Sequence, residues 1–125
     1  MTSTILVVDD DDAVRLMICR LLESQGYRTR PANNANAARA IVGQSPVDLA
    51  VVDIVMPGES GLSLATSLID QGSELPIVLV SGYSPDDPAA FAARHRTVTF
   101  VPKPFNPDEL LSIIADNLGR HVRRR

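Results

Sequence analysis

Five short apolar segments alternate along this chain with longer segments of helical period. The apolar segments lie near residues 4–9, 27–31, 48–53, 76–81 and 97–102, and most are rich in valine, isoleucine and leucine, as buried strands are. This alternation is typical of a parallel sheet whose strands are joined by crossover helices. We therefore expect an α/β domain with a doubly wound, five-stranded parallel sheet and helices on both faces.

The intervening segments predict five helices. In the first, apolar residues recur at spacings of 3 and 4 from Val14 to Leu22, and Gly26 is placed to end it. The second is alanine-rich and begins after a cap at Asn33 or Asn34. This second helix is predicted over residues 35–42. The third is predicted over 62–69, ending near Gly72, a short fourth over 87–94 and the fifth over 108–121. The fourth helix has the fewest apolar anchors and is expected to be the least stable.

Four of the apolar segments end on side chains that can do chemistry. Asp9 begins a run of four aspartates after the first segment, Asp53 ends the third, Ser81 ends the fourth, and Lys103 follows the fifth. In open parallel sheets the ligand site lies outside the carboxyl ends of the strands. These carboxylates, this hydroxyl and this ammonium are therefore expected to meet at one edge of the sheet.

The run from Asp9 to Asp12 is more than a helix cap requires. Capping explains two aspartates, but like charges about 4 Å apart cost roughly 4 kcal/mol at an effective dielectric near 20, which a bound cation would offset. We assign Asp9 and Asp10 to a metal site and Asp11 or Asp12 to the cap, because the first two lie closest to the strand. With Asp53 they form a set of oxygen donors suited to Mg²⁺, and Asp53 is the expected nucleophile.

Lys103 is the only lysine among twelve basic residues. A compact ammonium on a flexible stem can contact a carboxylate and then a phosphoryl oxygen in a crowded pocket, where a guanidinium would need a different geometry. The following Pro104 permits a cis peptide bond that would turn the lysine inward.

Composition excludes several classes of protein. The 125 residues suit one domain, with a core of about 4–120 and a basic tail at 121–125. A net charge of −3 argues against direct binding of nucleic acid. Cys19 lies in an apolar helical pattern and is interpreted as a buried thiol. The chain shows neither a long apolar stretch nor a secretion signal, so we expect a cytoplasmic protein without membrane insertion.

Together these residues resemble the response-regulator receiver domain over residues 5–118. The matching motifs are Asp9-Asp10, Asp53 with the following Met56-Pro57 and Gly61, Ser81, and Lys103-Pro104. The resemblance implies the flavodoxin-like strand order 2-1-3-4-5. It also implies a two-component or phosphorelay switch in which Asp53 takes a phosphoryl group from a phosphohistidine on a histidine kinase or a histidine phosphotransfer protein.

The resemblance also gives roles to individual residues. Mg²⁺, or Mn²⁺ in its place, would be held by Asp9, Asp10, Asp53 and the carbonyl of Val55, with Asp10 as a direct ligand and Asp9 acting through water. Lys103 and Ser81 would stabilise the phosphoryl group, and Phe100 would turn inward as Ser81 moves. Val55 and Tyr83 would flank the path of attacking water and tune dephosphorylation.

The chain has no recognisable effector segment. Output is expected through an unknown protein partner, through onward phosphotransfer, or by draining a relay. The resemblance implies that the chain is not an enzyme beyond its own phosphorylation and dephosphorylation.

Two other classes of function fit part of the pattern. A phosphatase of the haloacid-dehalogenase type also uses an aspartate nucleophile and Mg²⁺, and Asp9 and Asp11 have the required spacing after the first strand. The chain is too short to include the cap domain of such enzymes. A nucleotide- or flavin-binding module is less consistent with the sequence, because no glycine-rich phosphate loop follows the first strand.

Overall fold

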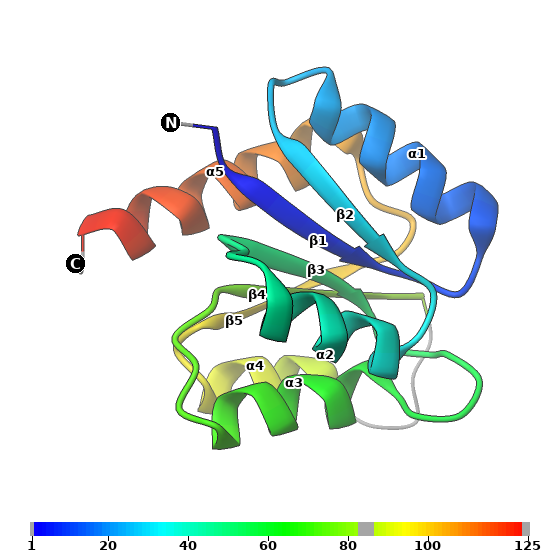
Figure 1. The fold of residues 1–125 in the computed structure, drawn as a ribbon, viewed down its shortest axis with the longest axis vertical. Helices are drawn as coiled ribbons and strands as arrows, with labels where there is room; N and C mark the ends of the chain where they lie inside the picture. Colours follow the sequence, from blue (N-terminus) through cyan, green and yellow to red (C-terminus); the bar gives the residue numbers. More distant parts are fainter. Residues whose placement is uncertain (1, 83–86, 124–125) are drawn as a thin grey trace.

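The protein folds around one five-stranded parallel sheet. The structure is a computed structural model that describes residues 2–82 and 87–123, with side chains as far as residue 119. The strands are β1 (Thr4–Val8), β2 (Arg28–Ala32), β3 (Leu49–Asp53), β4 (Ile77–Ser81) and β5 (Val98–Pro102). Their order in the sheet is β2-β1-β3-β4-β5 (Figure 1), which confirms the predicted topology.

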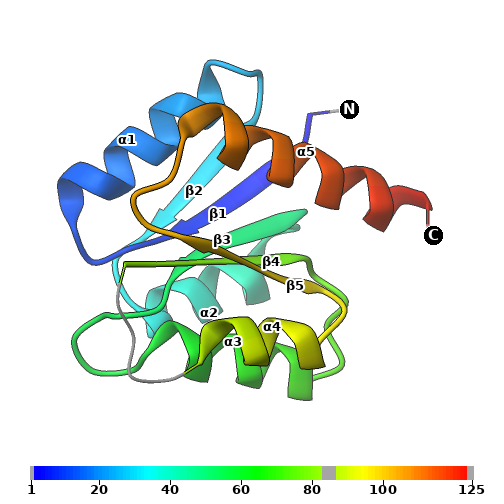
Figure 2. The ribbon, with the colours of Figure 1, turned by 180° about the vertical axis from the view of Figure 1, so that it is seen from behind.

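Five helices cover the sheet on both faces. They are α1 (Asp12–Glu23), α2 (Ala35–Gln44), α3 (Gly61–Asp70), α4 (Pro88–Arg94) and α5 (Pro107–Arg123). Helices α1 and α5 lie on one face and α2, α3 and α4 on the other, as Figures 1 and 2 show from opposite sides. The predicted helices are confirmed, with ends that differ by a few residues at most.

The two faces of the sheet bury separate apolar layers. Ile5 and Val7 of β1 pack in the layer under α1 and α5, whereas Leu6 and Val8 pack in the layer under α2 and α3. Strands β1, β3 and β4 are therefore buried on both sides, which explains why their sequences are continuous apolar runs instead of alternating ones. Cys19 is buried in the first of these layers, as predicted.

The local signals for helix ends act as the sequence indicated. Asp11 caps α1 by accepting hydrogen bonds from the backbone N–H groups of Ala13 and Val14, and Asn34 caps α2. The φ angle of Gly26 is +90°, in the left-handed region that glycine tolerates best, just after α1 ends. Helix α4 has a single buried side chain, Phe91, in agreement with its weak apolar pattern. Among the described residues, no helix has both the length and the apolar character needed to cross a bilayer.

Candidate functional site

The register of the sheet brings the predicted side chains to one edge. Val8 pairs with Val52, so Asp9 and Asp53 leave their neighbouring strands at the same level. On the other side of Asp53, Ser81 pairs with Pro102, and the backbone N–H of Lys103 donates to the Ser81 carbonyl at 2.8 Å. Four adjacent strands therefore bring their carboxyl ends to one edge, as expected for a parallel sheet. The side chains at these ends are Asp9, Asp53, Ser81 and Lys103.

Three carboxylates form a cluster at this edge. Asp9, Asp10 and Asp53 each offer an oxygen within 4.8 Å of the others. Asp9 and Asp53 are buried, at 2% and 7% exposure, whereas Asp10 is exposed. Three acidic oxygen donors at this spacing match the chemistry that a hard divalent cation such as Mg²⁺ requires.

Lys103 reaches into the same cluster. Its Nζ lies 3.5 Å from Asp53 Oδ1 and 3.5 Å from Asp9 Oδ2. The Lys103-Pro104 peptide bond is cis, an isomer that Pro104 permits but that the sequence alone did not decide. A single ammonium therefore contacts the two buried acids.

Asp53 has an unusual protonation equilibrium in this setting. Burial, together with the neighbouring charge of Asp9, raises its pKa from 3.8 to about 6, although Lys103 acts in the opposite direction. The carboxylate that is needed for attack on phosphorus is consequently dominant only above about pH 6 in the metal-free protein.

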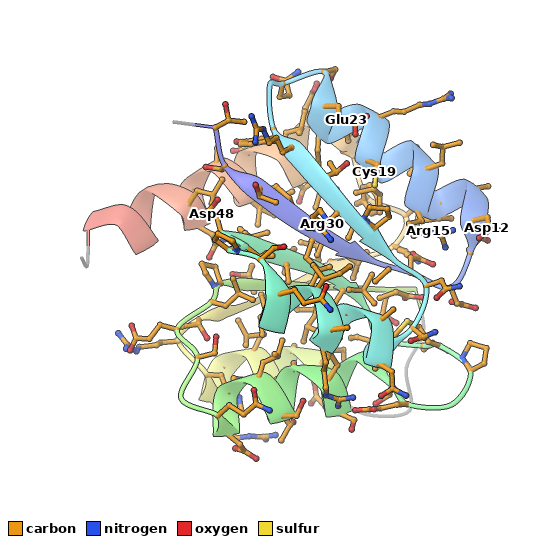
Figure 3. All side chains as sticks on the ribbon, viewed as in Figure 1. Asp12, Arg15, Cys19, Glu23, Arg30 and Asp48 are labelled. Carbon is orange, nitrogen blue, oxygen red and sulfur yellow. The ribbon has the colours of Figure 1, made fainter. Side chains whose placement is uncertain are left out.

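The backbone around Asp9 is held by Arg15, a residue that sequence analysis did not single out. Arg15 donates from Nη1 to the Asp9 carbonyl at 2.8 Å and from Nη2 to Asp12 Oδ1 at 2.5 Å. Figure 3 shows Arg15 and Asp12 near the start of α1, with Cys19 and Glu23 further along the same helix. The side chain of Asp9 also accepts from the N–H of Asp11 at 2.9 Å. The three-residue spacing of Asp12 and Arg15 was a usable sequence signal for this contact.

The loop after Asp53 is closed by a glycine that cannot be replaced freely. A Cβ atom at Gly61 would lie 2.2 Å from the carbonyl oxygen of Asp53, which the backbone could relieve only by moving. The N–H of Gly61 donates to the Ile54 carbonyl at 2.9 Å. In the same loop Met56 is buried and Val55 is 54% exposed. Helix α3 thus starts directly against the backbone of the predicted nucleophile.

The predicted switch residues line one cavity. Ser81 and Phe100 both contribute to a hollow of about 300 Å³ between β4, β5 and the start of α4, together with Gly82, Asp87, Pro88, Ala89 and Pro102. Phe100 is half-buried and packs against the layer under α3 and α4. Tyr83, predicted to tune dephosphorylation, lies outside the described residues.

Comparison with known proteins identifies the family. The response regulator receiver domain family matches residues 5–115. The chain belongs to the response-regulator receiver family. It is 34% identical over 120 residues to the DNA-binding transcriptional regulator NtrC of Azospirillum brasilense, covering 96% of this chain and 25% of NtrC. The chain spans between a quarter and about half of the length of the curated relatives that it matches.

Two solved structures extend the comparison to three dimensions. A CheY-like receiver domain protein from Methanospirillum hungatei superimposes with a TM-score of 0.90 at 26% identity, covering all of both chains. The response regulator TrrA from Thermotoga maritima, solved in complex with Mg²⁺ and BeF, superimposes with a TM-score of 0.81 at 30% identity over 93% of this chain and 99% of TrrA. This receiver domain is therefore a module of the phospho-accepting class used in two-component signalling.

The phosphatase alternative receives no support. It required Asp11 to act beside Asp9, but the Asp11 side chain caps α1 through two backbone N–H groups. The acids that lie near Asp9 in the pocket are Asp10 and Asp53, and Asp53 comes from a different strand.

Proposed function

We propose that this receiver domain is switched by transfer of a phosphoryl group to Asp53. The observation that carries this proposal is the convergence of Asp9, Asp10, Asp53 and Lys103 in one pocket at the carboxyl edge of the sheet. The chain would act as a single receiver unit that modifies only itself.

We infer that the pocket binds Mg²⁺, with Mn²⁺ as a substitute. Asp9, Asp10 and Asp53 would hold it, and the carbonyl of Val55 would complete the set. Once bound, the ion would neutralise phosphoryl oxygens that otherwise repel the carboxylates. The similar TrrA domain was solved with Mg²⁺ and a BeF group, which supports this choice.

Asp53, Lys103 and Ser81 would have separate roles in the transfer of the phosphoryl group. A carboxylate oxygen of Asp53 would form the new P–O bond as the P–N bond to the donor imidazole breaks. The electron pair of that P–N bond stays on the nitrogen that carried the phosphoryl group, and the donor leaves as a neutral imidazole whose other nitrogen keeps its proton. Lys103, already 3.5 Å from Asp53, would then contact a phosphoryl oxygen. The Ser81 hydroxyl, buried at the end of β4, would donate a hydrogen bond to another.

The phosphodonor would be a histidine kinase or a histidine phosphotransfer protein. Such a donor must approach closely enough to place its imidazole beside Asp53, so it needs a docking surface around the pocket. Among the residues whose side chains the structure describes, the exposed large apolar ones are Leu16 and Met17 on α1 and Val55, two residues after Asp53. They are suited to packing against the donor, and the output partner would be a second protein.

Chemical phosphorylation tests the proposal directly. Incubation with acetyl phosphate should add one phosphoryl group in the presence of Mg²⁺ or Mn²⁺ and none in the presence of a chelator. Asp53→Asn should abolish the added mass. Asp11→Asn is a matched control, because asparagine caps a helix as well as aspartate does and this variant should still be modified. Modification of Asp53→Asn to the extent seen in the unaltered protein would exclude Asp53 as the acceptor.

A further inference from the structure

An ion pair joins helix α2 to the loop that follows the phosphoacceptor strand. Arg39 of α2 donates from Nη1 to Glu59 Oε1 at 2.8 Å and from Nη2 to Glu59 Oε2. The guanidinium therefore binds the carboxylate in a bidentate manner, through two parallel hydrogen bonds. The two side chains are 29% and 31% exposed. Two-pronged pairing of this kind fixes orientation as well as distance.

The same two residues are also held by α3. Ser63 donates to Glu59 Oε2 at 2.8 Å, and Arg39 donates from Nε and Nη2 to the Ser67 hydroxyl at 3.2 and 3.1 Å. The hydrogen bond from Arg39, followed by that from Ser63, lowers the pKa of Glu59 to about 2. The Arg39–Glu59 pair thus remains charged at neutral pH and ties α2, the loop and α3 together.

The position of this pair along the loop is informative. Backbone hydrogen bonds fix the two ends of the 54–60 loop, from Ile54 N–H to Val80 and from Gly61 N–H to Ile54. Between them Met56 is buried in the core, while Val55, Pro57 and Gly58 are exposed. Glu59 is the point at which the outer part of the loop is attached to a neighbouring helix.

We propose that Arg39 and Glu59 are positioning residues for the phosphorylation site. By holding the 54–60 loop, they keep the backbone at Val55 in the arrangement that binds the divalent cation beside Asp53. The inference rests on the proposed function, since it assigns Val55 to the metal site. Arg39 and Glu59 touch neither the cation nor the phosphoryl group, and act only through the loop.

A second ion pair in the chain supplies a matched control. Arg96 donates to Glu74 at 2.7 Å, and these side chains are 60% and 61% exposed. Both residues lie near the amino ends of β4 and β5, at the edge of the sheet opposite the acidic pocket. Loss of this pair removes a surface interaction of the same chemistry without touching the loop.

The test compares Mg²⁺ affinity among variants by calorimetric titration of the whole chain. Arg39→Gln and Glu59→Gln should each weaken Mg²⁺ binding about three- to tenfold, below the usual cost of losing an outer-shell partner because the pair is partly exposed. The double variant should bind no more weakly than either single one. Arg39→Lys should give an intermediate Mg²⁺ affinity, because lysine keeps the positive charge but cannot make the two parallel hydrogen bonds of the guanidinium. Arg96→Gln should bind as the unaltered protein does.

Two further measurements separate positioning from general stability. Amide hydrogen exchange at residues 55–60 should accelerate in Arg39→Gln and stay unchanged in Arg96→Gln. The charge-reversed double variant, Arg39→Glu with Glu59→Arg, should recover a large part of the lost affinity. Unchanged Mg²⁺ affinity and loop exchange in Arg39→Gln would overturn the inference while leaving the proposed function intact. Failure of the unaltered protein to bind Mg²⁺ would overturn both.

Discussion

The Lys103 ammonium lies 3.5 Å from the Asp53 carboxylate, although Asp53 ends β3 and Lys103 follows β5. Lys103 opposes the effect of burial and of Asp9 on the pKa of Asp53. In Lys103→Met the pKa of Asp53 should therefore rise above its present value of about 6. A carbon-detected NMR titration of the aspartate carboxyl groups would measure it.

The matched variant is Lys103→Arg, which keeps the charge. This variant should keep the pKa of Asp53 near 6 but lose phosphorylation by acetyl phosphate, because a planar guanidinium cannot place one donor between Asp53 and a phosphoryl oxygen as an ammonium does. Phosphorylation of Lys103→Arg at the normal rate would show that charge alone is sufficient.

Burial of Asp53 should cost the metal-free protein stability at neutral pH. The folded-state pKa, about 6, lies above the ordinary value of 3.8, so the folded protein binds more protons between these values and its stability falls as pH rises through them. Asp53→Asn should accordingly raise the free energy of unfolding by about 1–2 kcal/mol at pH 7.5 and by little at pH 4. Urea unfolding in the presence of a chelator measures the free energy of unfolding at both pH values.

Addition of Mg²⁺ at pH 7.5 should make the unaltered protein more stable than Asp53→Asn, the reverse of the order expected without metal. The cation binds the folded form of the unaltered protein through its carboxylates, whereas Asp53→Asn has lost one of them. An Asp53→Asn variant that is less stable than the parent at both pH values without metal would contradict the burial argument.

The sequence predicted the strands and the pocket because both depend on local patterns. The apolar runs that end at Asp9, Asp53 and Ser81 must be covered on both faces, and parallel strands then place their carboxyl ends together. The sequence did not decide whether Asp11 or Asp12 caps α1, since choosing between two adjacent acids requires the backbone angles at the start of the helix.

The Arg39–Glu59 pair was not predicted, because it depends on how α2 lies against a distant loop. Asn117 was missed for a related reason. It reads as a polar position of an amphipathic helix, but it is buried against Thr99 of β5.

The lifetime of the phosphoryl group should depend on Val55 and Tyr83. Val55 is 54% exposed next to the acidic pocket and has no polar group that could orient an attacking water. Replacing both residues with polar ones, Val55→Asn with Tyr83→Gln, should accelerate autodephosphorylation about tenfold or more. Loss of the added mass with time after removal of acetyl phosphate gives the rate. An unaltered rate in the double variant would exclude shielding by these side chains.

Phosphorylation should be transmitted through Ser81 and Phe100 to the face formed by α4, β5 and α5. Both residues line the 300 Å³ cavity at the start of α4, so a displacement of Ser81 toward Asp53 changes the space available to Phe100. A hydrogen bond from the Ser81 hydroxyl to a charged phosphoryl oxygen would contribute about 1.5–3 kcal/mol. That free energy shifts a two-state equilibrium roughly ten- to a hundredfold. Helix α4 has a single buried side chain, Phe91, and we therefore expect it to be the element that is displaced most easily.

Amide chemical shifts on addition of Mg²⁺ and beryllofluoride, a mimic of the phosphoryl group, would test this coupling. The changes should be concentrated at residues 81–106 and should weaken in Ser81→Ala, which lacks the hydroxyl but keeps the small volume. Phe100→Ala should keep the changes near Asp53 and lose those at α4, because the ring that would turn into the cavity is gone. Changes confined to the loops around Asp10 and Asp53 in the unaltered protein would instead indicate a phosphoryl carrier without a conformational output, since the pocket would then bind the group without altering the surface that a partner meets.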